Sequence, residues 1–76
     1  MEIFYNTEVG RFELYRVILA ELFKGKREYL VYWKMGQEWR TECLYVSQEV
    51  LEDALAMGVL RPATADEVRT LDLDTF

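Results

Sequence analysis

Residues 27–39 read REYLVYWKMGQEW, and this stretch decides the fold because it contains the clearest strand pattern and the clearest turn in the chain. The aromatic and β-branched residues of 28–34 favour a strand. One face of that strand would carry Tyr29, Val31 and Trp33, and the other Leu30, Tyr32 and Lys34. Gly36 can take the positive φ of a tight turn. We therefore predict a β-hairpin that pairs residues 28–34 with residues 39–46.

The length and composition predict a single domain, residues 1–76. Of the 76 residues, 51 % are hydrophobic and 14 % aromatic, which is enough for a compact core near the lower size limit for folding without staples. The single cysteine, Cys43, cannot form an internal disulfide and suits a reducing compartment. The sequence shows neither an apolar run that could span a bilayer nor a signal peptide. We therefore expect an intracellular protein, cytoplasmic or nuclear, without a membrane partner.

Residues 11–23 are ambiguous between strand and helix. Their apolar spacing fits one face of a helix, whereas the β-branched Val17 and Ile18 and the turn-like residues 24–27 fit a strand. We favour the strand, which makes the fold mainly β with a C-terminal helix (α+β). The sheet is then curved, antiparallel and three- to four-stranded. Because neither face of the strands is cleanly polar, we expect the sheet to curl and bury parts of both faces.

Residues 47–58 have the best helix pattern. Ser47 is a suitable N-cap, and Gly58 can end the helix in a left-handed conformation. We expect the helix to pack across the sheet through one apolar stripe. That stripe comprises Val50, Leu51, Ala54 and Leu55.

Residues 59–76 form a C-terminal extension to this core. In it, residues 64–67 (TADE) have the form of a capping box, which predicts a second, short helix at about 65–71.

The charges are unevenly spread along the chain. Residues 1–46 carry seven acidic and seven basic residues, whereas residues 47–76 carry seven acidic and two basic ones, so the net charge of −5 lies in the C-terminal third. We do not expect a nucleic-acid partner, because the chain has few clustered lysine and arginine residues. The acidic third instead predicts an interaction surface for a basic protein. We assign to it Glu49, Glu52, Asp53, Asp66 and Glu67.

Most catalytic and metal-binding chemistry lacks its usual residues in this chain. There is no histidine, so the usual general base and the commonest metal ligand are missing. Ser47 and Cys43 consequently have no histidine to activate them, and a lone cysteine does not make a zinc site. The four glycines are scattered and form no phosphate-binding loop. We therefore expect no catalytic residues, no metal and no cofactor.

Residues 12–34, FELYRVILAELFKGKREYLVYWK, resemble the start of a chromodomain. The family has an aromatic residue, then an apolar pair, a basic turn with glycine, and a signature close to EYLVKWK. The matching residues here are Phe12, Val17, Ile18, Gly25, Glu28, Tyr29, Leu30, Val31, Trp33 and Lys34. The resemblance covers about residues 12–57. It implies a curved three-stranded sheet, related to small SH3-like barrels, with a helix across one end.

The resemblance also implies a function, because chromodomains bind methyl-lysine peptides in a cage of three aromatic rings while the peptide adds to the sheet as a strand. Phe12 and Trp33 match two cage positions, and Gly36 stands at the third, where Tyr5 or Tyr32 would have to supply the ring. We therefore predict a non-enzymatic module that binds an extended peptide through Phe12, Trp33 and Tyr32. Residues 1–10 could add a strand that occupies this groove.

Two other functions fit the sequence. A small acidic inhibitor or adaptor, of the kind encoded by phages and mobile elements, would block a basic nucleic-acid-binding complex with the acidic residues of 47–76. A homodimer built on the helix at 47–58 would have a structural role.

Overall fold

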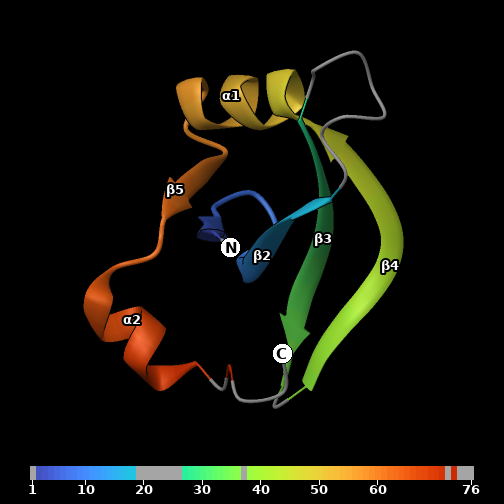
Figure 1. Cartoon of the computed structure of the whole chain (residues 1–76). Helices are drawn as coiled ribbons and strands as arrows, with labels where there is room; N and C mark the ends of the chain where they lie inside the picture. The colour runs from blue at the N-terminus through green and yellow to red at the C-terminus, as the bar shows by residue number, and fades with distance from the viewer. Residues whose placement is uncertain (1, 19–26, 37, 72, 74–76) are drawn as a thin grey trace.

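The computed structural model describes residues 2–18, 27–36, 38–71 and 73, and it leaves the side chains of residue 35 and residues 41–44 undescribed. The predicted turn at 24–27 and the end of the ambiguous segment, residues 19–23, thus lie largely outside the described residues. The elements are β1 (Glu2–Asn6), β2 (Arg11–Ile18), β3 (Glu28–Met35), β4 (Glu38–Ser47), α1 (Gln48–Ala56), β5 (Leu60–Pro62) and α2 (Ala65–Thr70). The fold is therefore mainly β with short helices. Figure 1 shows α1 and α2 at opposite ends of a strongly curved sheet.

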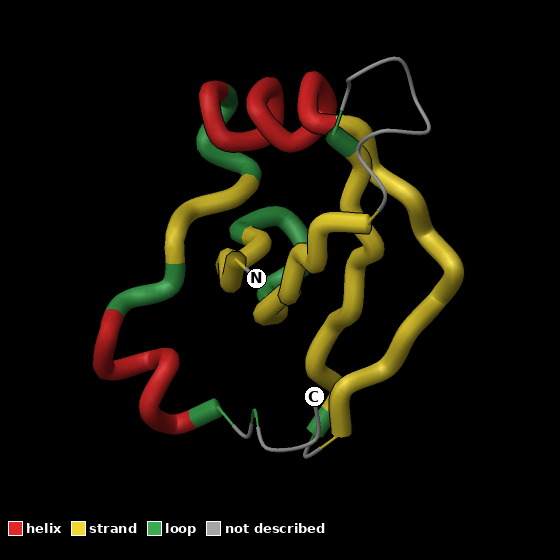
Figure 2. The backbone as a smooth tube through the Cα atoms, in the orientation of Figure 1, coloured by secondary structure: helices red, strands yellow, loops and turns green. Residues whose placement is uncertain are grey.

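The strands form one antiparallel sheet in the order β4-β3-β2-β1-β5. Figure 2 shows how this open sheet curls, with β4 and β5 as its two edges. The predicted hairpin is confirmed as β3 and β4, and Gly36 has the expected positive φ of 60° in its turn. The strand reading of residues 11–23 is confirmed for Arg11–Ile18.

The expectation of three to four strands was wrong, because the described part of the sheet has five. β5 is the strand that the pattern did not predict, and it pairs with β1 between Phe4↔Pro62 and Asn6↔Leu60. Backbone hydrogen bonds continue this pairing at both ends, from Thr7 N to Val59 O at 2.8 Å and from Ala63 N to Ile3 O at 3.0 Å. Three residues are too few to show alternation, and the proline argues against a strand when it is seen in sequence alone.

Both faces of the sheet contribute to the core, as predicted. The face that packs on α1, here called the helix face, carries Phe4, Tyr15, Tyr29, Val31 and Leu60, and Leu51 of α1 packs against them. On the other side, here called the opposite face, Leu14 is 0 % exposed. Directly paired residues of neighbouring strands share a face, so the registers assign the paired residues with described side chains to one side or the other.

Helix α1 begins and ends where its sequence signals predict. Ser47 Oγ accepts a hydrogen bond from Val50 N at 3.3 Å, and Gly58, just beyond the last turn, has φ 76°. The predicted apolar stripe was wrong in one member, because Val50 is 56 % exposed. Only Leu51, Ala54 and Leu55 contact the core cluster. The curved sheet covers only one side of the helix, and Val50 lies outside that side.

Helix α2 confirms the predicted capping box. Thr64 Oγ1 accepts from Glu67 N at 3.2 Å, and the Glu67 carboxylate accepts from Thr64 N at 2.9 Å. The helix spans Ala65–Thr70, and the next residue, Leu71, is buried.

Candidate interaction surfaces

The structure does not bring the predicted site residues Phe12 and Trp33 together. Trp33 pairs with Glu13 across β2 and β3, so its side chain lies on the helix face. Phe12 precedes Glu13 in the same strand and therefore points to the opposite face. Trp33 is only 6 % exposed, and the Arg11 guanidinium carbon lies 4.4 Å from the centroid of its ring. The two rings cannot line one groove.

Strand β1 occupies the edge of β2 beside Phe12, as expected for residues 1–10. Tyr5 is the direct cross-strand partner of Phe12, and the two rings meet edge to face with centroids 5.0 Å apart. On its other side, Tyr5 has the Arg61 guanidinium 4.7 Å from its ring centroid. The place where a partner peptide would pair with β2 is thus filled by the chain itself.

A buried polar network on the helix face was missed by the sequence analysis. The carboxylate of Glu13, a residue that is 3 % exposed, accepts from Arg11 Nε at 2.9 Å, from the Tyr15 hydroxyl at 3.1 Å and from Asn6 Nδ2 at 3.4 Å. Burial raises the pKa of the Tyr15 hydroxyl, and the negative charge of Glu13 raises it further. Arg11, Glu13 and Tyr15 are every second residue of one strand. This spacing alone predicts that their side chains lie on the same face. The network holds the Arg11 side chain over Trp33.

An open recess of about 470 Å³ lies on the opposite face, beside Phe12. Its lining includes Tyr5, Phe12, Lys34, Gly36, Thr70 and Leu71. Lys34 Nζ is buried and has no hydrogen-bond partner among the described residues. The ring of Trp39, the cross-strand partner of Lys34, has its centroid 5.4 Å from this nitrogen. A ring from β1, a ring from β2 and a cation from β3 thus meet in one place.

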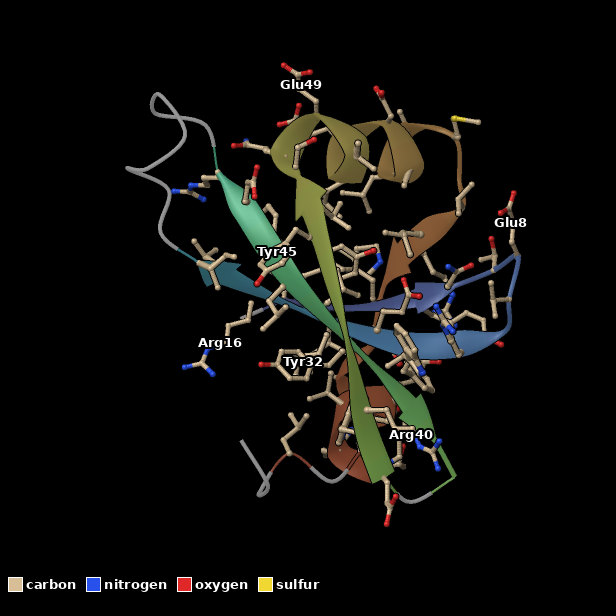
Figure 3. The ribbon with its side chains drawn as sticks, turned by 90° about the vertical axis from the view of Figure 1, so that its right-hand side faces the viewer. Glu8, Arg16, Tyr32, Arg40, Tyr45 and Glu49 are labelled. Atoms are coloured by element: carbon tan, nitrogen blue, oxygen red, sulfur yellow. The ribbon has the colours of Figure 1, made fainter. Side chains whose placement is uncertain are left out.

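Tyr32, the third predicted site residue, belongs to a different part of the opposite face. Leu30 pairs with Arg16 on one side and with Tyr45 on the other, and Tyr32 follows two residues later on the same face. Figure 3 shows Arg16, Tyr32 and Tyr45 on one side of the sheet and Arg40 on the other. Tyr45 is 59 % exposed, and Tyr32 is half-buried. We call Arg16, Leu30, Tyr32 and Tyr45 the tyrosine surface.

The two edges of the sheet differ in how readily they could pair with another strand. β5 has three residues and ends in Pro62, and a short edge strand with proline resists further pairing. β4 has ten residues without proline, and within the described residues it pairs with β3 alone. Tyr45 of the tyrosine surface is part of β4. A long edge strand therefore lies directly beside exposed aromatic surface.

The five predicted acidic residues lie at two ends of the molecule. Glu49, Glu52 and Asp53 are exposed on α1, whereas Asp66 and Glu67 belong to α2 at the other end (Figure 1). Met57, directly after α1, is 76 % exposed.

The acidic residues of α2 are already engaged within the chain. Asp66 pairs with Arg69, and Glu67 forms a two-pronged pair with Arg61 at 2.8 and 2.9 Å. Hydrogen bonds from Arg61, and then from the Thr64 backbone, lower the pKa of Glu67 from 4.5 to about 2. The contact with Glu67 also raises the pKa of Arg61. The five predicted carboxylates therefore do not form one continuous surface, and Glu52 on α1 also accepts a hydrogen bond, from Gln48 Nε2 at 2.9 Å.

No family model, curated protein or solved structure matches this chain. The resemblance to chromodomains therefore stays a prediction. Among the described residues, no three His, Cys, Asp or Glu side chains gather where they could hold a metal ion. No helix in the described part of the chain is long and apolar enough to cross a membrane.

Proposed function

We propose that this protein is a non-enzymatic interaction module that binds an extended segment of a partner protein along strand β4. One observation carries the proposal. The ten-residue strand β4 is unpaired on its outer side within the described residues, and it carries the exposed Tyr45. An unpaired edge strand offers a row of backbone donors and acceptors, and an added strand satisfies them. The partner segment gains its affinity from these main-chain hydrogen bonds.

The tyrosine surface supplies side-chain contacts for the same segment. Tyrosine and arginine are enriched in protein interfaces, where their broad rings or planar groups are covered by the partner. Tyr45 would pack directly against a side chain of the added strand. Tyr32 on β3 and Arg16 on β2 lie one and two strands further in, and they extend the surface that a long side chain of the partner would cover. This arrangement replaces the predicted groove of Phe12 and Trp33, and it retains Tyr32 as a binding residue.

The test uses peptides selected from a random displayed library against the wild-type chain. Tyr45→Ala is expected to weaken binding of the selected peptides at least about tenfold, as a typical hot-spot residue does. Val50→Ala on α1 removes a side chain of similar exposure, 56 % against 59 %, and should leave binding unchanged. In an added strand, every second backbone N–H of the peptide faces β4. Methylation of those nitrogens should abolish binding, whereas methylation of the nitrogens between them should leave binding unchanged. If every methylated peptide still bound, strand addition would be refuted.

A second copy of the chain could also pair through β4. Such a dimer is an alternative to the binding of a segment from another protein. Sedimentation of the wild type and of Tyr45→Lys distinguishes it, because a lysine on the edge strand disfavours pairing between two identical edges. A monomer in both cases leaves the edge available for a peptide. A dimer that the lysine abolishes would identify the partner segment as β4 of a second copy.

The finer fold assignment, a chromo-like or SH3-like small barrel, is part of the same proposal. Its support is the order β2, β3, β4, α1, which follows the strand–strand–strand–helix order of that family, and the strong curvature of the sheet. Helix α1 follows β4 without a break and contributes Leu51 to the core.

The acidic surface of α1 favours a second candidate function, that of an inhibitor or adaptor for a basic protein complex. Glu49, Glu52 and Asp53 are exposed together on one helix, and carboxylates there can stand in for the phosphates of a nucleic acid. Poly-lysine is a suitable probe. Binding should weaken with added salt and with neutralisation of these three residues, but not with neutralisation of Glu2, Glu8 and Glu38, three exposed carboxylates elsewhere. Equal loss in both triple variants would show that only the net charge matters.

A further inference from the structure

The recess beside Phe12 contains a cation that lacks an acceptor among the described residues. Lys34 lines the recess, and its Nζ is buried with no hydrogen-bond partner in the described part of the chain. Removing an ammonium group from water is costly unless an acceptor or an opposite charge replaces the water. The Trp39 ring, at 5.4 Å, offsets only part of that cost through its π face. A bound anion would satisfy the donor.

The neighbouring cations are directed elsewhere. Arg11 contributes to the lining of the recess, but its Nε donates to Glu13 at 2.9 Å and its guanidinium lies over Trp33 on the helix face. Arg61 is held by Glu67 at 2.8 and 2.9 Å. Of these three cations, Lys34 is therefore the one whose donor has no partner among the described residues.

The residues that line the recess indicate which kind of anionic ligand would fit it. Tyr5 and Phe12 present rings 5.0 Å apart, and Leu71 closes another side. A Cβ built on the lining residue Gly36 would meet nothing within 4 Å, so the space beside this residue is open. An apolar group fits such walls, and a carboxylate next to it would meet the ammonium once the flexible Lys34 side chain turns toward the opening. A charge-assisted hydrogen bond of this kind is about twice as strong as a neutral one.

We propose that this recess binds a free carboxylate carried by an apolar residue, as at the C-terminal residue of a peptide. Lys34 Nζ donates to the carboxylate, and the rings of Tyr5 and Phe12 pack against the side chain of the bound residue. The site is separate from strand addition at β4, and it would stand if no segment bound there.

The first test is an NMR titration with N-acetyl-phenylalanine, which has the required carboxylate and ring. The indole N–H resonances of Trp39 and Trp33 act as reporter and internal control, because Trp39 lies near Lys34 and Trp33 lies on the other face. We expect a saturable shift of the Trp39 resonance and none for Trp33. The neutral amide of the same compound should bind at least about tenfold more weakly, which corresponds to about 1.4 kcal/mol. Equal affinity for acid and amide would overturn the proposal.

Variants test the role of Lys34 directly. Lys34→Met keeps the apolar stem and removes the donor, so the preference for acid over amide should disappear, whereas Lys34→Arg should retain most of it. Arg16→Met removes a cation from the same face outside the recess and should change nothing. If Lys34→Met still preferred the acid over the amide, the role of Lys34 would be refuted. Stronger binding of inorganic phosphate than of N-acetyl-phenylalanine would also overturn the proposal. Binding seen only after Asp72→Asn and Asp74→Asn would also overturn it, in favour of the chain's own carboxylates.

Discussion

Replacing Glu13 with alanine tests whether the buried network on the helix face stabilises the fold. The variant leaves the hydroxyl of Tyr15, a residue that is 5 % exposed, without its acceptor at 3.1 Å, which costs about 1–3 kcal/mol. Arg11 loses its 2.9 Å partner, but its side chain is 29 % exposed and solvent can replace the bond, so we assign it less than about 1 kcal/mol. We expect a total loss of about 1–4 kcal/mol. That is a large part of the roughly 4–11 kcal/mol typical of a chain of 76 residues.

Urea unfolding followed by circular dichroism measures this loss through linear extrapolation. Adding Tyr15→Phe to the Glu13→Ala variant should restore about 1 kcal/mol, because the unsatisfied hydroxyl is removed with its acceptor. Glu8→Ala, in the exposed turn after β1, is the matched control and should change the free energy of unfolding by less than about 0.5 kcal/mol. The reasoning is refuted if Glu13→Ala loses as little as the control, or if the double variant is no more stable than Glu13→Ala alone.

Three further predictions concern other parts of the fold. The lowered pKa of Glu67, about 2 against 4.5, means that its ionised carboxylate stabilises the folded state above about pH 4.5 and that this contribution is lost as the pH falls toward 2. Wild type should therefore lose more stability than Glu67→Gln across this window in urea unfolding, and parallel pH profiles would contradict the ion pair. Leu14→Ala should cost about 2–5 kcal/mol, because Leu14 is 0 % exposed, whereas Tyr45→Ala should stay within about 0.5 kcal/mol; similar thermal shifts for both would argue against the assigned faces. Gly58→Ala should cost about 1–2 kcal/mol from its φ of 76° alone, because the new Cβ meets nothing within 4 Å, and an unchanged unfolding midpoint would show that the turn relaxes.

Local signals predict most of the regular structure. The alternation in residues 28–34 predicts β3 and places Trp33 and Tyr32 on different faces, as observed. The capping residues Ser47 and Thr64 predict the starts of both helices. Each of these signals acts within a few residues, through strand alternation or a hydrogen bond to the first turn, and therefore does not depend on the rest of the fold.

The candidate sites were less predictable, because each depends on contacts between distant segments. The resemblance assigns Phe12 and Trp33 to one aromatic cage. The spacing of the two residues in the sequence does not determine the register in which β2 and β3 pair. The observed register sets Trp33 opposite Glu13 and so turns Phe12 to the other face. A shift of the register by one residue would have reversed this. The recess could not be foreseen either, since Leu71 reaches it from the far end of the chain.

The sequence by itself determined which segments become strand, turn and helix, because alternation, glycine conformation and helix capping are short-range effects. The tertiary structure decided which rings are buried together, that Val50 of α1 stays exposed and that Lys34 is enclosed without an acceptor among the described residues. Burial depends on what packs over a side chain, and in this sheet the covering residues come from distant parts of the chain. Which surfaces remain available for a partner therefore follows from strand register and sheet curvature.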